Sequence, residues 1–136
     1  MTFDHERLDV YRVALEFVAW AFQVCQRLSG AHRHAREQLL RSSQSVPQNI
    51  AEGNGKRSVA DRHRFWEIAR GSALESAASL DVLVACRALS VDEADAGKRV
   101  LHRIVSMLTR MTDPAGHVRE DGAERGIDYE YECRSA

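Results

Sequence analysis

The sequence predicts an all-α protein, an antiparallel up-down-up-down bundle of four helices joined by short links. The chain has 136 residues, enough for one domain with its own core, and 44% of them are hydrophobic. It contains only two prolines and eight glycines, so helix-breaking residues are scarce. Four long segments carry apolar residues at helical spacing. Four helices with short connections favour an up-down bundle.

The first helix is expected from about Asp4 to Leu28, and it carries two apolar stripes instead of one. One stripe comprises Leu8, Tyr11, Leu15, Val18, Phe22 and Cys25. The other comprises Val10, Ala14, Phe17, Ala21, Val24 and Leu28. A helix on the outside of a monomer needs one apolar face. We therefore expect the second stripe, Val10, Ala14, Phe17, Ala21 and Val24, to be an oligomer interface. The alternative is that this helix is the central helix of a monomer.

The second helix is expected to begin between His32 and Arg36 and to end at Gly53 or Gly55. Pro47 lies inside it, so we expect a kink there. Nearby serine hydroxyls are candidates to bond the carbonyls that the proline leaves free. These are Ser42, Ser43 and Ser45.

The third and fourth helices each begin with a capping box. Ser58 is followed three residues later by Asp61, and Ser90 has the same relation to Glu93. The third helix is expected to reach about Cys86. The fourth is expected to end at "TDPAGH".

The charges divide the chain into two parts. Residues 1–112, the expected bundle, carry 16 basic and 13 acidic residues, a net charge of +3. Residues 113–136 carry 3 and 7, a net charge of −4, and few apolar residues, so we expect an acidic, disordered tail. We find no apolar run long enough for a membrane span and no signal-peptide layout, and we expect a cytoplasmic protein without membrane contact.

Polar residues in the second and third helices are expected to share a buried face. Asn49 and Glu52 are three residues apart, and buried polar groups need partners. The expected polar network, which would set the helix register, comprises Asn49, Glu52, Arg70, Ser72 and Glu75.

Three segments of the chain resemble a bacterial family of four-helix bundles associated with intervening sequences of 23S ribosomal RNA genes. They are "LDVYRVALEFV", "QLLRSSQSVPQNIAEGNGKRS" and "RFWEIARGSALES", and the resemblance covers about residues 3–111. The family pattern falls on Ser45, Pro47, Asn49, Ile50, Ala51, Glu52 and Gly53, then on Phe65, Ala69, Arg70, Gly71, Ser72 and Glu75. Members resemble the accessory protein Avd of diversity-generating retroelements. The resemblance implies pentameric rings, with nucleic-acid binding as the usual proposal.

Basic residues concentrate in the middle of the chain. Residues 33–70 hold eight basic and four acidic residues, and no aromatic residue is interleaved with the bases in the pattern that favours base stacking. The candidate contacts to RNA or DNA are Arg33, Arg36, Arg41, Lys56, Arg57, Arg62 and Arg64. The alternative is a solvated arginine-rich face on a protein–protein interaction module, whose partner would be encoded nearby.

The residues do not favour an enzyme, a metal site or a cofactor site. His32 and His34 lack a further ligand at helical spacing, and Ser72 has no accompanying histidine. The three cysteines are far apart, which is typical of free thiols in a reducing compartment. We therefore expect a non-enzymatic, self-associating protein.

Overall fold

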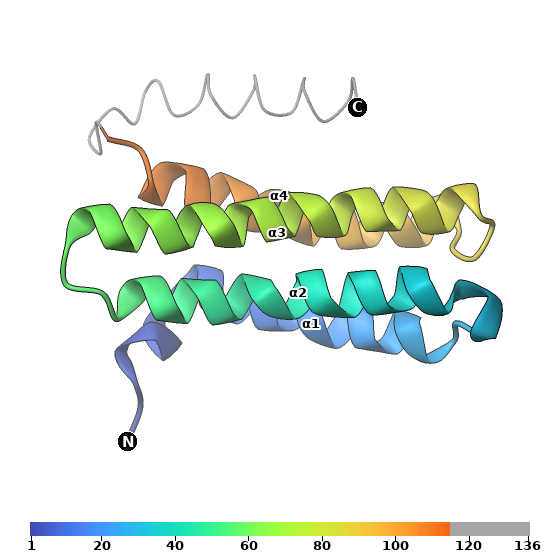
Figure 1. Cartoon of the computed structure of the whole chain (residues 1–136), viewed down its shortest axis with the longest axis horizontal. Coiled ribbons are helices and arrows are strands. Elements are labelled where there is room, and N and C mark those ends of the chain that lie inside the picture. Colours follow the sequence, from blue (N-terminus) through green and yellow to red (C-terminus); the bar gives the residue numbers. More distant parts are fainter. Residues whose placement is uncertain (115–136) are drawn as a thin grey trace.

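Four antiparallel helices form the bundle that the sequence predicts (Figure 1). The computed structural model describes residues 1–114. The elements are η1 Asp4–Arg7, α1 Asp9–Gln26, η2 Gly30–His32, α2 Arg33–Asn54, α3 Val59–Ala85 and α4 Val91–Met111. Helix α1 packs against α2 and α4, and α3 packs against the same two helices. The bundle is therefore a closed square of neighbours in which every helix has one inner face.

The two ends of the bundle carry different links (Figure 1). The N-terminus, the α2–α3 link and the end of α4 lie at one end, and the α1–α2 and α3–α4 links lie at the other. The expected tail, residues 113–136, falls almost wholly outside the described residues and stays a prediction. No helix within residues 1–114 is long and apolar enough to cross a bilayer.

The first helix begins later than the sequence predicts. Residues Asp4–Arg7 form a separate 3-10 turn, and Leu8 is extended before α1 starts at Asp9. The Glu6 carboxylate accepts a hydrogen bond from the backbone N–H of Phe3 at 2.6 Å. This local bond satisfies a donor at the start of the short turn and favours it as a unit separate from α1.

Helices α3 and α4 begin after the serines that the sequence predicts as their N-caps, and the structure shows the serine half of each predicted capping box. The Ser58 hydroxyl accepts from the N–H of Asp61 at 3.1 Å, and the Ser90 hydroxyl accepts from the N–H of Glu93 at 3.1 Å. Each bond satisfies one of the free donors in a first helical turn.

Arg27, at the end of α1, forms an ion pair with Glu93, at the start of α4. The hydrogen bond from Arg27 holds the pKa of the Glu93 carboxyl below its usual value.

The α3–α4 turn places an arginine in a backbone conformation that glycine usually adopts. Arg87 has φ of 60°. The N–H of Ala88 bonds the carbonyl of Leu83 at 2.9 Å, a six-to-one closure that ends the helix. A side chain at this position costs backbone energy that glycine would not pay.

Helix α2 continues through Pro47 without interruption. Contrary to our expectation, the serine hydroxyls do not bond the carbonyls beside the proline. The Ser42 and Ser43 hydroxyls donate instead to the carbonyls of Leu39 and Leu40, at 3.3 and 3.0 Å. Both serines are buried, so these short-range bonds satisfy hydroxyls that have no access to water.

Candidate functional site

The stripe of α1 that we assigned to an oligomer interface lies in the core of a single chain, so that assignment is wrong. Val10 and Val24 are 3% exposed, and the three residues between them in the stripe are 0% exposed. These are Ala14, Phe17 and Ala21. The two stripes are centred about 120° apart around the helix, and both have helical spacing. The rotation of α1 about its own axis decides which stripe is buried, and the spacing alone does not determine that rotation.

The middle of the other stripe is left at the surface, whereas Cys25 at its end is 2% exposed. Leu15 is 44% exposed and Phe22 is 50% exposed, while Tyr11 and Val18 are partly buried. We call these four residues the apolar strip. An isolated exposed leucine is common, but four apolar residues in a row along one helix form a continuous surface.

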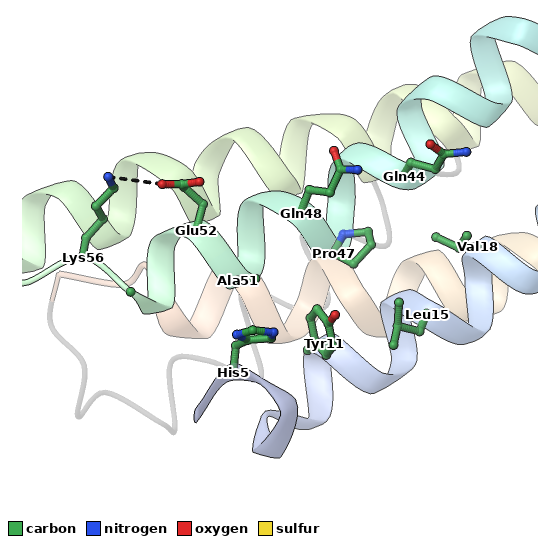
Figure 2. A pocket seen from close by; sticks show the side chains of 11 residues that line it. His5, Tyr11, Leu15, Val18, Gln44, Pro47, Gln48, Ala51, Glu52 and Lys56 are labelled. Carbon is green, nitrogen blue, oxygen red and sulfur yellow. Dashed lines mark ion pairs between the residues drawn. The ribbon is translucent and has the colours of Figure 1, made fainter. Parts of the chain in front are cut away.

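The apolar strip forms one wall of an open groove of about 710 Å³ between α1 and α2 (Figure 2). Tyr11, Leu15 and Val18 come from α1. The α2 wall consists of Gln44, Pro47, Gln48 and Ala51. At one end of the groove lie His5, Glu52, Gly55 and Lys56. Most of the groove surface is apolar, the amides of Gln44 and Gln48 are its polar groups along α2, and one end is charged, so it is suited to a protein surface more than to a small polar substrate.

The turn between α2 and α3 is held tightly by Trp66. The indole Nε1–H donates to the carbonyl of Ile50 at 3.2 Å. A Cβ added to Gly53 would lie 2.7 Å from the Trp66 Nε1 atom and 3.0 Å from the Arg62 carbonyl oxygen. Only glycine leaves room for the indole there, and this contact fixes where the following basic residues lie.

Four of the predicted nucleic-acid contacts gather at this turn. We call Lys56, Arg57, Arg62 and Arg64 the basic end. The Arg62 Nε–H donates to the carbonyl of Lys56 at 2.7 Å, which joins the link to the first turn of α3. Lys56 pairs with Glu52 at 3.2 Å, an exposed pair that contributes little to stability.

An aromatic ring lies among these cations: Phe65 follows Arg64 in the chain, and the fold brings Lys56 to the same ring. The Lys56 Nζ atom lies 5.0 Å from the centroid of the Phe65 ring, and the Arg64 guanidinium lies 4.8 Å from it. Lys56 is nine positions from Phe65 in the chain, so the α2–α3 turn brings them together. The expectation that no aromatic residue is interleaved with the bases is therefore wrong at this end.

The other three predicted nucleic-acid contacts are elsewhere. Arg33, Arg36 and Arg41 lie in the first half of α2, whose 22 residues span about 33 Å. Arg36 lies beside Cys25, whose thiol donates to the Arg36 carbonyl at 3.8 Å. Burial raises the pKa of the Cys25 thiol, and the Arg36 charge offsets part of that effect. The seven basic residues therefore form two groups instead of one surface.

The predicted polar network is present only in part. The Asn49 amide donates to the Ser45 hydroxyl at 2.9 Å, and the Ser45 and Ser72 hydroxyls are 2.8 Å apart. A second pair, Ser42 and Ser76, joins the same two helices at 2.8 Å in the buried interior. The network that connects α2 and α3 is therefore a ladder of hydroxyl groups.

The charged members of the predicted network do not join it. Glu52 is exposed and pairs with Lys56, and Glu75 is exposed. The Arg70 Nε–H donates to the Thr109 hydroxyl of α4 at 3.0 Å, so Arg70 serves a different interface. Sequence reasoning missed Ser76 and Thr109. The run of small residues in the third helix was a signal for Ser76, because small side chains let helices approach closely enough for hydroxyls to meet.

Within residues 1–114, no three His, Cys, Asp or Glu side chains are grouped as metal ligands. Ser72, weighed as a nucleophile, shares its hydroxyl with Ser45.

The helices, the groove and the basic end define a four-helix bundle with an open apolar surface. The family of 23S rRNA-intervening sequence proteins matches residues 6–110, nearly the whole described bundle. The chain belongs to this family. A crystal structure from Bacteroides thetaiotaomicron, of a protein of unknown function from the S23 ribosomal protein family, superposes with a TM-score of 0.72. It is 23% identical in sequence, and the match covers 76% of this chain and 98% of that one. None of the curated proteins compared with the chain matches it.

Proposed function

We propose that this protein is a non-enzymatic homo-oligomeric scaffold whose copies associate through the groove between α1 and α2. The observation that carries the proposal is the apolar strip: Leu15 and Phe22 are about half exposed, and Tyr11, Leu15 and Val18 line a groove of about 710 Å³. Water contact with such a surface is unfavourable, and a second copy would remove it. The family resemblance favours a ring of five copies, in which a head-to-tail contact closes without leaving free ends.

The non-enzymatic part of the proposal is supported by where the candidate chemical groups lie. Ser72 is bonded to Ser45, Glu75 is exposed, and Arg70 reaches α4. These groups serve different surfaces and do not converge on the groove. The groove is open and mainly apolar, with Gln44 and Gln48 as the polar groups along α2, whereas catalytic sites hold convergent polar groups.

The test of self-association is native mass spectrometry with a matched pair of variants. We expect the unaltered chain to give five times the chain mass of 15.3 kDa at tens of micromolar. Leu15→Glu should release monomers, because it places a charge in the interface. Val82→Glu, at a valine of α3 that is 51% exposed, is the control and should leave the assembly intact. Circular dichroism would verify that both variants remain helical.

A monomer at these concentrations in the unaltered protein would overturn the scaffold proposal. An assembly that survives Leu15→Glu would show that the copies meet elsewhere on the bundle.

A second function is favoured by the basic end. Four cations belong to this end, and two of them, Lys56 and Arg64, lie within 5.0 Å of the Phe65 ring centroid. Cations that neutralise phosphates and an aromatic ring that contacts bases are the two parts of a single-strand binding surface. We therefore propose that the scaffold binds RNA or DNA through this end, repeated once per copy.

Fluorescence anisotropy of a labelled oligouridylate at several salt concentrations tests this second function. Arg57→Gln combined with Arg64→Gln should weaken binding and reduce the slope of log K against log salt by about 1.4, since each phosphate contact on a single strand contributes about 0.7. The control pair is Arg33→Gln with Arg41→Gln, in the other half of α2. Absence of binding at about 50 mM salt would exclude nucleic acid as the partner. The alternative is then a protein–protein interaction module, and its partner, encoded nearby, should co-purify with it.

A further inference from the structure

The guanidinium of Arg64 is held beside an aromatic ring and still faces solvent. It lies over the Phe65 ring, 4.8 Å from the ring centroid, and 4.0 Å from a carboxylate oxygen of Asp61. The ring attracts the cation, and the carboxylate lies at the limit of an ion pair. The Arg64 side chain is nevertheless 65% exposed. The contacts therefore favour one position of the guanidinium and leave much of it open to a ligand.

The second cation at this ring is less suited to contact a nucleobase. The Lys56 ammonium lies 5.0 Å from the same centroid, pairs with Glu52 at 3.2 Å, and its side chain is 36% exposed. An ammonium is a compact point charge, whereas a guanidinium is planar and stacks on flat rings. The Phe65 ring is half-buried and already contacts both cations, so a base that approached the ring itself would have to displace one of them.

We propose that an unpaired nucleobase stacks on the solvent side of the Arg64 guanidinium, so that the basic end selects single strands. This inference rests on the proposed nucleic-acid function. Guanidinium planes, like aromatic rings, stack on bases that are not held in a duplex. The N–H donors of a guanidinium lie in its plane, so Arg64 can donate to a phosphate from its edge while its face contacts a base.

Phe65 acts in this site through Arg64, as a positioning residue. The negative face of its ring attracts the guanidinium, and both residues lie on the first turns of α3. This part of α3 is tied to α2 at the next position, where the Trp66 indole bonds the carbonyl of Ile50 at 3.2 Å. The stacking surface is therefore formed before a ligand arrives, which lowers the entropy cost of binding.

Two labelled oligomers of equal length and charge test the stacking. One is oligothymidylate, and the other has the same backbone with an abasic site at every position. Fluorescence anisotropy at about 50 mM salt should show that oligothymidylate binds at least about fivefold more tightly, the lower limit for one stacked base. Arg64→Lys retains the charge, so it should abolish this preference without changing the salt dependence of binding to the abasic oligomer. The control is Arg57→Lys, at an exposed arginine that lies over no ring within residues 1–114, and it should retain the preference.

Variants of the ring test its positioning role. Phe65→Leu should lose the preference, whereas Phe65→Tyr keeps an aromatic face and should retain it, and circular dichroism would verify that both are folded. A preference that survives Phe65→Leu would overturn the role of the ring.

The same measurements separate this inference from the function on which it rests. Equal affinity of the unaltered protein for the two oligomers, or an unchanged preference in Arg64→Lys, would overturn base stacking and leave phosphate binding intact. Absence of binding to either oligomer would refute nucleic-acid binding itself, and the stacking inference with it.

Discussion

Replacing two glycines by alanine in the middle of two helices should change stability in opposite directions. Gly71 lies in α3 and is exposed, and a Cβ built there meets no atom within 4 Å. Gly97 lies in α4 and is buried, and a Cβ there would be 2.5 Å from the Cη2 and Cζ3 atoms of Trp20. It would also be 3.0 Å from the Leu80 side chain. Alanine's advantage in helix propensity applies at both positions, but the steric cost of the added methyl group applies only at Gly97.

The magnitudes follow from these two contributions. Alanine is favoured over glycine in a helix interior by about 1 kcal/mol at both positions. Inserting a methyl group into a filled space costs roughly 1–3 kcal/mol, and this applies only at Gly97. Gly71→Ala should therefore raise the free energy of unfolding by about 1 kcal/mol, and Gly97→Ala should lower it by about 0–2 kcal/mol. The helix contribution cancels in the difference between the variants, which should be about 1–3 kcal/mol.

Urea denaturation followed by circular dichroism measures this difference. At slopes of about 1–3 kcal/mol per molar urea, the two midpoints should differ by roughly 0.3–3 M. The protein concentration must be equal in all samples, because self-association would add to the apparent stability.

The cause can be isolated by removing the clashing atoms. Trp20→Phe deletes the Cη2 and Cζ3 atoms of the indole. In that background Gly97→Ala should cost at least about 1 kcal/mol less than in the unaltered chain, a coupling expected of residues in direct contact. If Gly97→Ala stabilises the protein as much as Gly71→Ala does, the close approach of α1 to α4 through Trp20 is incorrect.

Three further outcomes are expected. Ser42→Ala and Ser76→Ala should each cost about 1–3 kcal/mol in urea denaturation, and the double variant should cost less than their sum, because it leaves no unpaired hydroxyl; additive losses would contradict the 2.8 Å bond. Arg87→Gly should stabilise the protein by about 1 kcal/mol in the same assay, since φ of 60° strains a side chain; a loss would show that the arginine side chain matters more. Burial raises the pKa of the Cys25 thiol, so this thiol ionises first in the unfolded state as pH rises, and its contribution to stability falls above its ordinary pKa of 9.0. Iodoacetamide labelling resolved by mass spectrometry should be slower at Cys25 than at exposed Cys86 at every pH from neutral to 9. Equal labelling rates would refute the burial of Cys25.

Local features of the fold could be read from the sequence because their causes are local. Ser58 and Ser90 begin helices since a hydroxyl three residues ahead of a free N–H can bond it in any context. The four helices follow from apolar spacing and from the scarcity of glycine and proline. The start of α1 was missed, because the Phe3–Glu6 bond forms a short turn that competes with a longer helix.

Contacts between helices could not be read in the same way. Both stripes of α1 have helical spacing, so Val10 and Leu15 are equally good candidates for the core until the rotation of the helix is known. That rotation is set by the packing of Phe17 and Trp20 against the other helices, including the gap that Gly97 leaves for the indole. The buried hydroxyl pairs also depend on the distance between α2 and α3, which no single helix determines.

The amino-acid sequence alone determined that this chain is a four-helix bundle, where α3 and α4 begin, and where its charges are concentrated, because these properties depend on residues close together in the chain. Only the tertiary structure decided which face of α1 remains exposed and that Lys56 lies over the ring of Phe65. The physical reason is that a surface of this kind forms only when the helices pack together. Each depends on how the helices are rotated and how closely they approach, and close packing of side chains from all four helices fixes both quantities together.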